Sequence, residues 1–189
     1  MNLRLYFLFI LLMPLFVYSQ FDQKKVYEIK RINNPPKIDG SLEDEVWNEF
    51  KNNPLHIAKD FIQLEPNNGQ PEREGKETNV KICYDDRHLY FGVMMYDNFP
   101  DSILKQLSKR DEKEKNCDFF GIWINPFNDG QIEYEFTVTA AGVQADSKIT
   151  PNSYDKSWNS VWKSAVKINE EGWVVEIAIP FIPIAGIIP

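Results

Sequence analysis

Short segments with the residue pattern of β-strands recur along the chain of 189 residues and are separated by turns. In residues 131–139 apolar and polar side chains alternate strictly, so we expect a strand with one face in the core and the other, carrying Glu133 and Glu135, in water. Residues 89–96 and 119–125 are apolar on both faces, which predicts central strands covered on both sides. The other candidates are residues 78–84 and 173–180, which are well marked, and residues 26–31, 143–149 and 161–168, which are weaker.

One short helix is expected near the N-terminus, in residues 39–50, where Ser41 can cap the helix and Asp44 can answer from the third position. Near the other end, Gly172 permits the positive φ of a tight hairpin turn. Many short strands with a single helix predict an all-β fold, a β-sandwich of the immunoglobulin or jelly-roll kind with one short helix near the N-terminus. The strand order stays open at this point.

The first 20 residues have the layout of a secretory signal peptide. Arg4 is their only charge, an apolar run covers residues 5–13, Pro14 breaks it, and the small Ser19 lies near the end. A membrane anchor is the alternative, but the segment falls short of the roughly 20 apolar residues that a span requires. We therefore expect export of a domain over residues 21–181 to the periplasm, the outer envelope or the extracellular space.

Charge and motifs exclude several classes of function. The chain has 28 Asp and Glu against 21 Lys and Arg, a balance that argues against nucleic-acid binding. Phosphate-loop, dinucleotide, zinc-protease and hydrolase-elbow motifs are absent. Glu133 and Glu135 lie about 7 Å apart on one strand face, the spacing of an inverting glycosidase pair. A wet face supplies no raised pKa, so we expect a non-catalytic domain.

Aromatic residues are a better guide to a ligand, because flat rings stack on the C–H faces of sugars. Three tryptophans fit core positions in the predicted strands and helix: Trp47, Trp123 and Trp173. Trp158 and Trp162 lie in a polar segment beside Asp155 and Asn159, and we predict that these four residues bind a ligand. Packing of the two rings against the sheet is the alternative.

Acidic residues gather at the predicted strand ends, and Asp97 and Asp118 are candidate ligands of a structural calcium ion. Solvated turns explain the same positions equally well. In an exported chain, Cys83 and Cys117 could pair across neighbouring strands, or they could be two buried free thiols.

Four ordered segments resemble the carbohydrate-binding modules of family nine: PPKIDGSLEDEVW, VKICYDDRHLYFGVMMYDN, DFFGIWINP with IEYEFTVTAAGVQAD, and EEGWVVEIAIPF. The resemblance implies a β-sandwich that binds glucose-type or xylan-type sugars, with calcium holding its loops. It is closest to a subgroup in which the module opens a larger exported envelope protein with a barrel-like C-terminal region. The family's sugar-binding residues do not carry over, since its first Trp falls near Lys115, its Glu at Gly121 and its Arg at Thr137.

Our first hypothesis is a non-catalytic, exported carbohydrate-binding domain, the N-terminal part of a larger envelope or polysaccharide-processing protein. The alternative is a structural or docking module that has lost sugar binding and contacts an outer-membrane barrel or a missing C-terminal region. A third hypothesis is that the chain is part of a glycoside hydrolase. Residues 182–189 form an atypical apolar tail, which suggests a C-terminally truncated product. Truncation would leave the strand over residues 173–180 as an uncovered edge.

Overall fold

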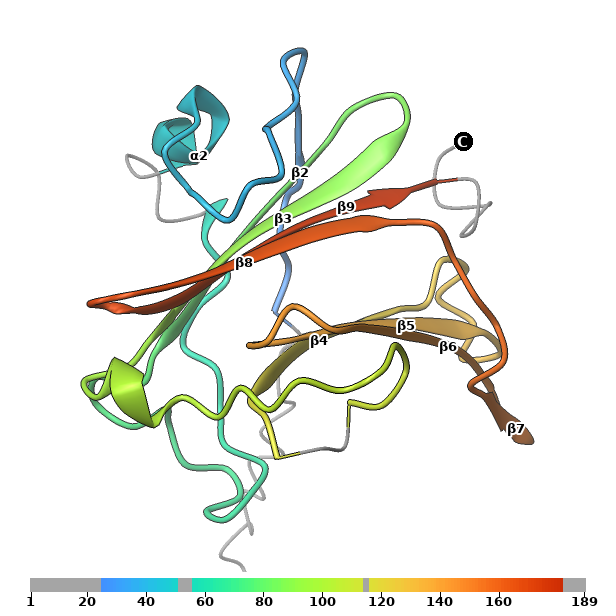
Figure 1. Cartoon of the computed structure of the whole chain (residues 1–189). Helices are drawn as coiled ribbons and strands as arrows, with labels where there is room; N and C mark the ends of the chain where they lie inside the picture. Colours follow the sequence, from blue (N-terminus) through green and yellow to red (C-terminus); the bar gives the residue numbers. More distant parts are fainter. Residues whose placement is uncertain (1–24, 51–55, 114–115, 182–189) are drawn as a thin grey trace, which may run out of the picture.

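A computed structural model describes residues 25–50, 56–113 and 116–181. Within these residues the chain forms two β-sheets, of five and four strands, packed face to face (Figure 1). The signal peptide predicted over residues 1–20 and the tail over residues 182–189 lie outside the described residues. No described helix is long and apolar enough to cross a membrane. The predicted all-β sandwich is confirmed.

The five-stranded sheet has the order β1-β2-β3-β9-β8. Its strands are β1 (Lys30–Arg31), β2 (Thr78–Tyr84), β3 (His88–Tyr96), β8 (Lys163–Asn169) and β9 (Gly172–Pro180). β1 pairs with β2 in parallel, and all other neighbours are antiparallel. The hairpin predicted at Gly172, which has a φ of 143°, joins β8 to β9. Because β9 pairs along its whole length with β3 and also with β8, the expectation of an uncovered edge there is wrong.

The four-stranded sheet has the order β4-β5-β6-β7, with all neighbours antiparallel. Its strands are β4 (Phe119–Ile124), β5 (Glu133–Thr139), β6 (Gln144–Thr150) and β7 (Ser153–Asp155). β4 lies at the edge of this sheet, and Phe119 and Trp123 are about half exposed on it. The prediction of a central strand over residues 119–125 is therefore wrong: the two-sided apolar pattern reflects exposed rings rather than a second covering layer.

The main core lies between the two sheets. Alternate residues of β3 and β9 face it from one side, and alternate residues of β5 face it from the other. Its central members are Phe91, Val93, Phe136, Val138, Trp173, Val175 and Ile177, all buried. Burying one such side chain contributes about 1.5–3 kcal/mol. The prediction that Trp173 is a core residue is confirmed.

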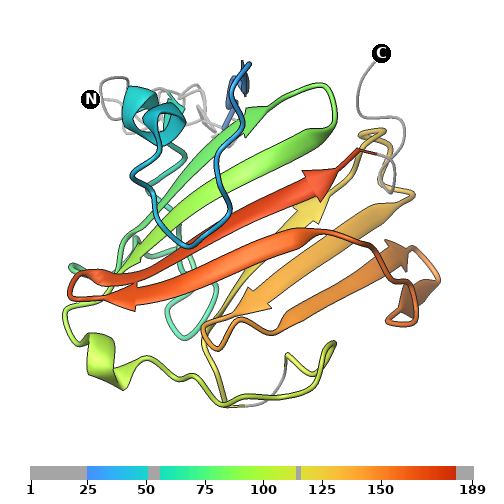
Figure 2. The same cartoon turned by 45° about the horizontal axis from the view of Figure 1, so that its top comes forward.

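The short helix α2 (Glu45–Glu49) covers part of the outer face of the five-stranded sheet (Figure 2). Its N-cap residue is Asp44, three residues after the predicted cap at Ser41. Asp44 stands at the N-cap position without a side-chain cap hydrogen bond, and its carboxylate instead accepts the Lys37 N–H at 2.7 Å. The predicted capping box is therefore wrong: Asp44 takes the N-cap position, and Ser41 lies in a turn before the helix that another residue anchors.

Trp47 on this helix, predicted to be in the core, is fully buried and is held across three strands. Lys81, Gly92 and Glu176 are register partners on β2, β3 and β9. The indole lies on Gly92, where an added Cβ would meet two of its ring atoms at 3.0 Å. The indole N–H donates to Glu176 Oε1 at 2.8 Å, and Lys81 Nζ donates to the Trp47 carbonyl at 2.9 Å. We call this arrangement the Trp47 clasp.

Glu176 also holds the turn before the helix. Its Oε2 accepts the backbone N–H groups of Asp39 at 2.8 Å, Gly40 at 2.7 Å and Ser41 at 3.2 Å. Burial raises the pKa of this carboxyl group, and the four donors act in the opposite direction. Without them a buried carboxylate would be strongly unfavourable. One side chain of β9 thus fixes the whole segment from Asp39 to Trp47.

The two cysteines are free thiols. Cys83 is buried in the cluster beneath α2, on the outer face of the five-stranded sheet, and Cys117 lies two residues before β4 of the other sheet. Burial raises the pKa of the Cys83 thiol to about 12. Of the two alternatives, the structure shows free thiols, although Cys117 is only partly buried.

The substitution Glu176→Gln is expected to lower the free energy of unfolding by about 2–3 kcal/mol, since the amide NH2 must face either the indole N–H or the three backbone N–H groups. Urea unfolding followed by circular dichroism measures the loss. Glu170→Gln, at an exposed residue of the turn before β9, is the matched control and should change stability by less than about 0.5 kcal/mol. Equal midpoints for the two variants would contradict the role given to Glu176.

Candidate functional site

The two tryptophans predicted to bind a ligand are packed into the protein. Trp162 is 6% exposed, meets Phe136 edge to face at 5.5 Å, and donates its indole N–H to Asp146 at 2.7 Å. Trp158 is partly buried, with its ring 4.9 Å from that of Tyr134. Of the two alternatives, packing against the sheet is what the structure shows for Trp162 and in part for Trp158, because both join the core between the sheets.

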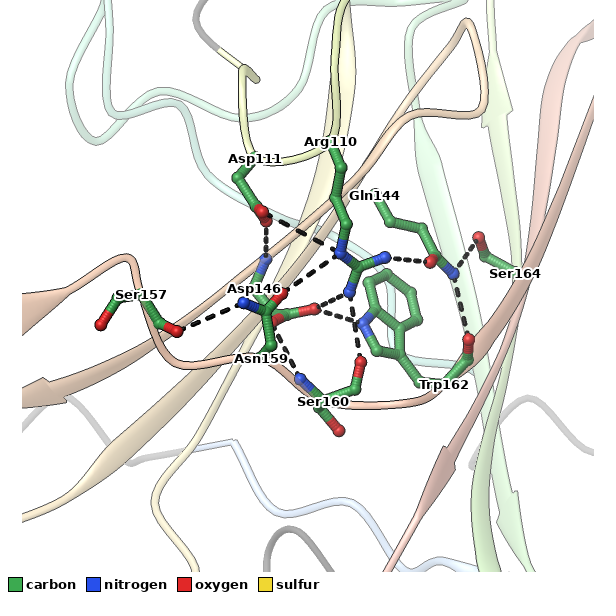
Figure 3. Close-up of polar contacts among 9 residues, drawn as sticks. All are labelled: Arg110, Asp111, Gln144, Asp146, Ser157, Asn159, Ser160, Trp162 and Ser164. Atoms are coloured by element: carbon green, nitrogen blue, oxygen red, sulfur yellow. Dashed lines mark hydrogen bonds and ion pairs between the residues drawn. The ribbon is translucent and has the colours of Figure 1, made fainter.

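Arg110 organises the polar residues around Trp162 (Figure 3). Its guanidinium donates to Gln144 Oε1 at 2.7 Å, to Asn159 Oδ1 at 3.4 Å, and to the fully buried carboxylate of Asp146. Asp146 also accepts the Ser160 N–H at 3.1 Å. The network ties the loop before β4 to β6 and to the segment that leads into β8. We interpret it as structural.

Asp155 lies at the margin of this network and reaches it through Ser157, whose carbonyl accepts the Asn159 amide at 3.2 Å. It is exposed, and its carboxylate accepts the N–H and the hydroxyl of Ser157 at 2.9 and 2.6 Å, which lowers its pKa. The structure thus brings Asn159 and Trp162 into one network, which Asp155 joins only at its margin through Ser157. A role of Trp158, Trp162, Asp155 and Asn159 in ligand binding stays a prediction.

The two predicted metal ligands are engaged elsewhere. Asp97 accepts the Phe99 N–H at 2.7 Å and pairs with Lys76, and Asp118 accepts the Leu104 N–H at 3.1 Å. No group of three or more His, Cys, Asp or Glu side chains suited to a metal ion occurs in the described part of the chain. The residues described do not fit a calcium site built on these two carboxylates, and calcium binding stays a prediction.

A different set of side chains meets on the outer face of the four-stranded sheet. Trp123 extends from β4 and is 51% exposed. Its ring lies back over Gly121, where an added Cβ would stand 2.8 Å from two ring atoms. The glycine therefore lets a large flat ring lie along the strand while half of its surface faces solvent.

Glu135 of β5 is the register partner of Trp123 and is 2% exposed. Its carboxylate accepts hydrogen bonds from Lys113 and Tyr154, from Ser147 at 2.7 Å and from Thr137 at 3.1 Å. The expectation that Glu135 lies on a wet face is wrong. The loop that carries Lys113 and the ring of Tyr154 reach over this face and supply partners for the carboxylate.

The electrostatics of Glu135 favour its ionised form. Burial raises its pKa, but the hydrogen bonds from Lys113, Tyr154 and Ser147 outweigh burial, and the net pKa is lowered. The carboxyl group is therefore an acceptor at neutral pH and lacks the raised pKa that a general acid needs.

Lys113 completes the arrangement. Its ammonium lies 5.9 Å from the centre of the Trp123 ring and 6.0 Å from that of Tyr154, within the range of cation–π contacts. Tyr154 is 45% exposed. We call Lys113, Trp123, Glu135 and Tyr154 the Trp123 face. It presents two half-exposed rings beside an ammonium group that a buried carboxylate holds in place, so it offers stacking surfaces together with hydrogen-bond donors and acceptors.

Sequence reasoning missed this face because it assigned Trp123 to the core. A signal was present: Gly121 lies two residues before Trp123 and so on the same strand face. A glycine inside a strand often marks a place where another group approaches closely. The contributions of Lys113 and Tyr154 depend on contacts between distant segments and left no local pattern.

Comparison with known proteins gives one family match. The family model described as carbohydrate family 9 binding domain-like matches residues 38–188. A search of curated proteins found no match.

Three solved structures are similar to the chain. Two are of a family 9 carbohydrate-binding module from Caldicellulosiruptor kristjanssonii, in complex with cellotriose (TM-score 0.48, 67% of that chain covered) and with glucose (TM-score 0.49, 69% covered); both are 18% identical and cover 80% of this chain. The third is a Bacteroides uniformis protein to which carbohydrate binding has been ascribed, with a TM-score of 0.58, 14% identity, and coverage of 80% of this chain and 71% of that one. The third agrees with the sandwich fold.

Glu135→Gln is expected to destabilise the protein by about 1–2 kcal/mol at pH 7, because Lys113 loses its carboxylate partner. Since the folded pKa of Glu135 is lowered, its stabilising contribution is present above the unfolded value near 4.5 and is lost as the pH falls through the folded pKa. The difference between variant and parent should therefore shrink below about pH 4. Urea unfolding at pH 7 and pH 3.5 measures it.

Glu133→Gln is the control, since Glu133 lies on the same strand face and its side chain makes no hydrogen bond to another described residue. It should leave stability nearly unchanged at both pH values. A loss for Glu135→Gln that is equally large at pH 3.5 would contradict the ionised state assigned to Glu135.

Proposed function

The chain belongs to the carbohydrate family 9 binding domain-like family, and from this premise we propose that it binds carbohydrate on the Trp123 face. Membership confirms the resemblance seen in the sequence. Binding of glucan-type or xylan-type sugars, which that resemblance implies, is part of the proposal.

The half-exposed ring of Trp123 is the single observation that carries this proposal. A pyranose ring has a face of C–H groups that packs against a flat aromatic surface, and its hydroxyl groups both donate and accept hydrogen bonds. Lys113 and Tyr154 lie at the edge of such a stack. Glu135 accepts hydrogen bonds from both, so they are oriented before any ligand arrives, which reduces the entropy cost of binding.

The geometry favours binding over hydrolysis. A glycosidase needs a second carboxyl group, at about 5–9.5 Å, and a carboxylic acid with a raised pKa. Glu135 has a lowered pKa and is surrounded by donors that hold it ionised. We therefore propose a non-catalytic module, while the activity of any longer parent protein is a separate question.

We also propose that the chain is exported and that it forms the front part of a larger envelope or polysaccharide-processing protein. The signal-like pattern of residues 1–20 and the resemblance to modules that open envelope proteins support this. A docking role for the sandwich is the alternative if no saccharide binds to it.

Trp123→Ala is expected to weaken saccharide binding at least about tenfold, since it removes the stacking surface and leaves the sheet intact. Isothermal titration calorimetry with cellotriose and xylotriose measures the effect. Phe99→Ala is the matched control, because Phe99 is 70% exposed and lies outside the Trp123 face. A Trp123→Ala isotherm identical to that of the parent, or parent protein that binds neither sugar, would refute the proposal.

Trp158→Phe separates this site from the one predicted in the sequence. The ring of Trp158 packs against Tyr134 and Phe136, so phenylalanine keeps much of the packing and removes the indole. We expect unchanged affinity for both sugars. A loss of affinity as large as that of Trp123→Ala would show that the sugar binds at the segment around Asp155 and Asn159 instead.

A further inference from the structure

We propose that the outer face of the five-stranded sheet carries a second site for a neutral saccharide, opposite to the Trp123 face. The two sites lie on the two outer faces of the sandwich, as Figure 1 shows for the sheets themselves. The inference relies on the proposed function only for the class of ligand, because the two sites share no residue.

The site is a groove beside the turn that Glu176 anchors. One hollow of about 560 Å³ lies between this turn and strands β2, β3, β8 and β9, and a second of about 390 Å³ adjoins it. Asn79 and Tyr96 line both hollows. Together the hollows form what we call the Tyr96 groove, whose combined size suits a short oligosaccharide.

The floor of the groove is apolar and the rim is polar. Met94 and Val174 form a buried floor on β3 and β9, and the side chain of Leu42 closes one wall. The partly buried ring of Tyr96 lies at the junction of the two hollows. Apolar surface beside an aromatic ring suits the C–H face of a sugar, as it does on the Trp123 face.

The groove also holds polar groups with unused capacity. No hydrogen bond joins the Asn79 amide or the Tyr96 hydroxyl to another described residue. An amide offers two donors and an acceptor, and a phenol offers one of each, which matches vicinal hydroxyl groups. Both side chains are partly buried, so a ligand would exclude water from them.

The two hollows differ in charge. In the larger one Lys81 and Lys167 are countered by Glu43 and Glu171, and Lys81 already donates to the Trp47 carbonyl. The smaller one has Lys59 against Asp60, Glu72 and Glu77, so the groove as a whole disfavours an anion. The unused donors and acceptors of Asn79 and Tyr96 suit a neutral ligand with many hydroxyl groups, and a saccharide meets that description.

The test is a titration of the 15N-labelled full chain with cellotriose and with xylotriose, followed by amide chemical shifts. We expect two independent sets of shifting amides. One set covers residues 78–81 and 171–174 at the Tyr96 groove, and the other covers residues 121–123 and 135 at the Trp123 face. Tyr96→Ala should raise the dissociation constant of the first set at least about tenfold and leave the second unchanged. Trp123→Ala should do the reverse.

If the amides at the Tyr96 groove do not shift with up to about 10 mM of either sugar, the proposed site in the groove is wrong. Shifts that Trp123→Ala abolishes in both sets would also overturn it, because they would show one site with a distant response. If the parent chain shows shifts at the Tyr96 groove but none at the Trp123 face, the proposed function is refuted and the proposed groove site is supported. If Tyr96→Ala does not fold, Lys167→Ala at the exposed rim replaces it, with an expected weakening of about threefold in the first set only. An unchanged first set would then refute the groove.

Discussion

The Trp47 clasp is the interaction on which the rest of the fold depends. A buried tryptophan, lying on Gly92, is bonded at its indole by Glu176 and at its carbonyl by Lys81. The clasp draws the N-terminal segment over part of the outer face of β3 and β9, so these two strands are covered on both sides there and can be largely apolar, with Glu176 as the buried exception. In the part of the chain that the structure describes, the loop before β4 and the ring of Tyr154 reach over the outer face of the other sheet, and Trp123 stays half exposed there.

Two buried glutamates, one on each outer face, show how the same residue type serves two purposes. The described donors to Glu176 are all neutral N–H groups, and burial raises its pKa. Glu135 has Lys113 among its donors, and its pKa is lowered. The first holds a turn and a helix in place. The second stays charged and orients a lysine and a tyrosine beside a half-exposed ring, so a buried charge here positions the proposed binding surface.

The sequence predicted the parts of the fold that depend on local pattern. The strands β2, β3 and β9, the hairpin at Gly172 and the burial of Trp47 and Trp173 follow from residue spacing. The site was not predictable in the same way. The sequence of a strand that is apolar on both faces, such as β4, predicts a central strand. The same sequence also occurs where one of the two faces is exposed to solvent. Glu135 appeared exposed because its partners, Lys113 and Tyr154, come from segments that only the fold brings together.

The central claim is that a saccharide stacks on Trp123. Intermolecular nuclear Overhauser effects between the C–H protons of bound cellotriose and the tryptophan indoles test it most directly. We expect contacts from the sugar to the Trp123 ring and to the neighbouring Tyr154 ring, and none to Trp162, whose ring is buried. Sugar contacts to Trp158 with none to Trp123 would contradict it.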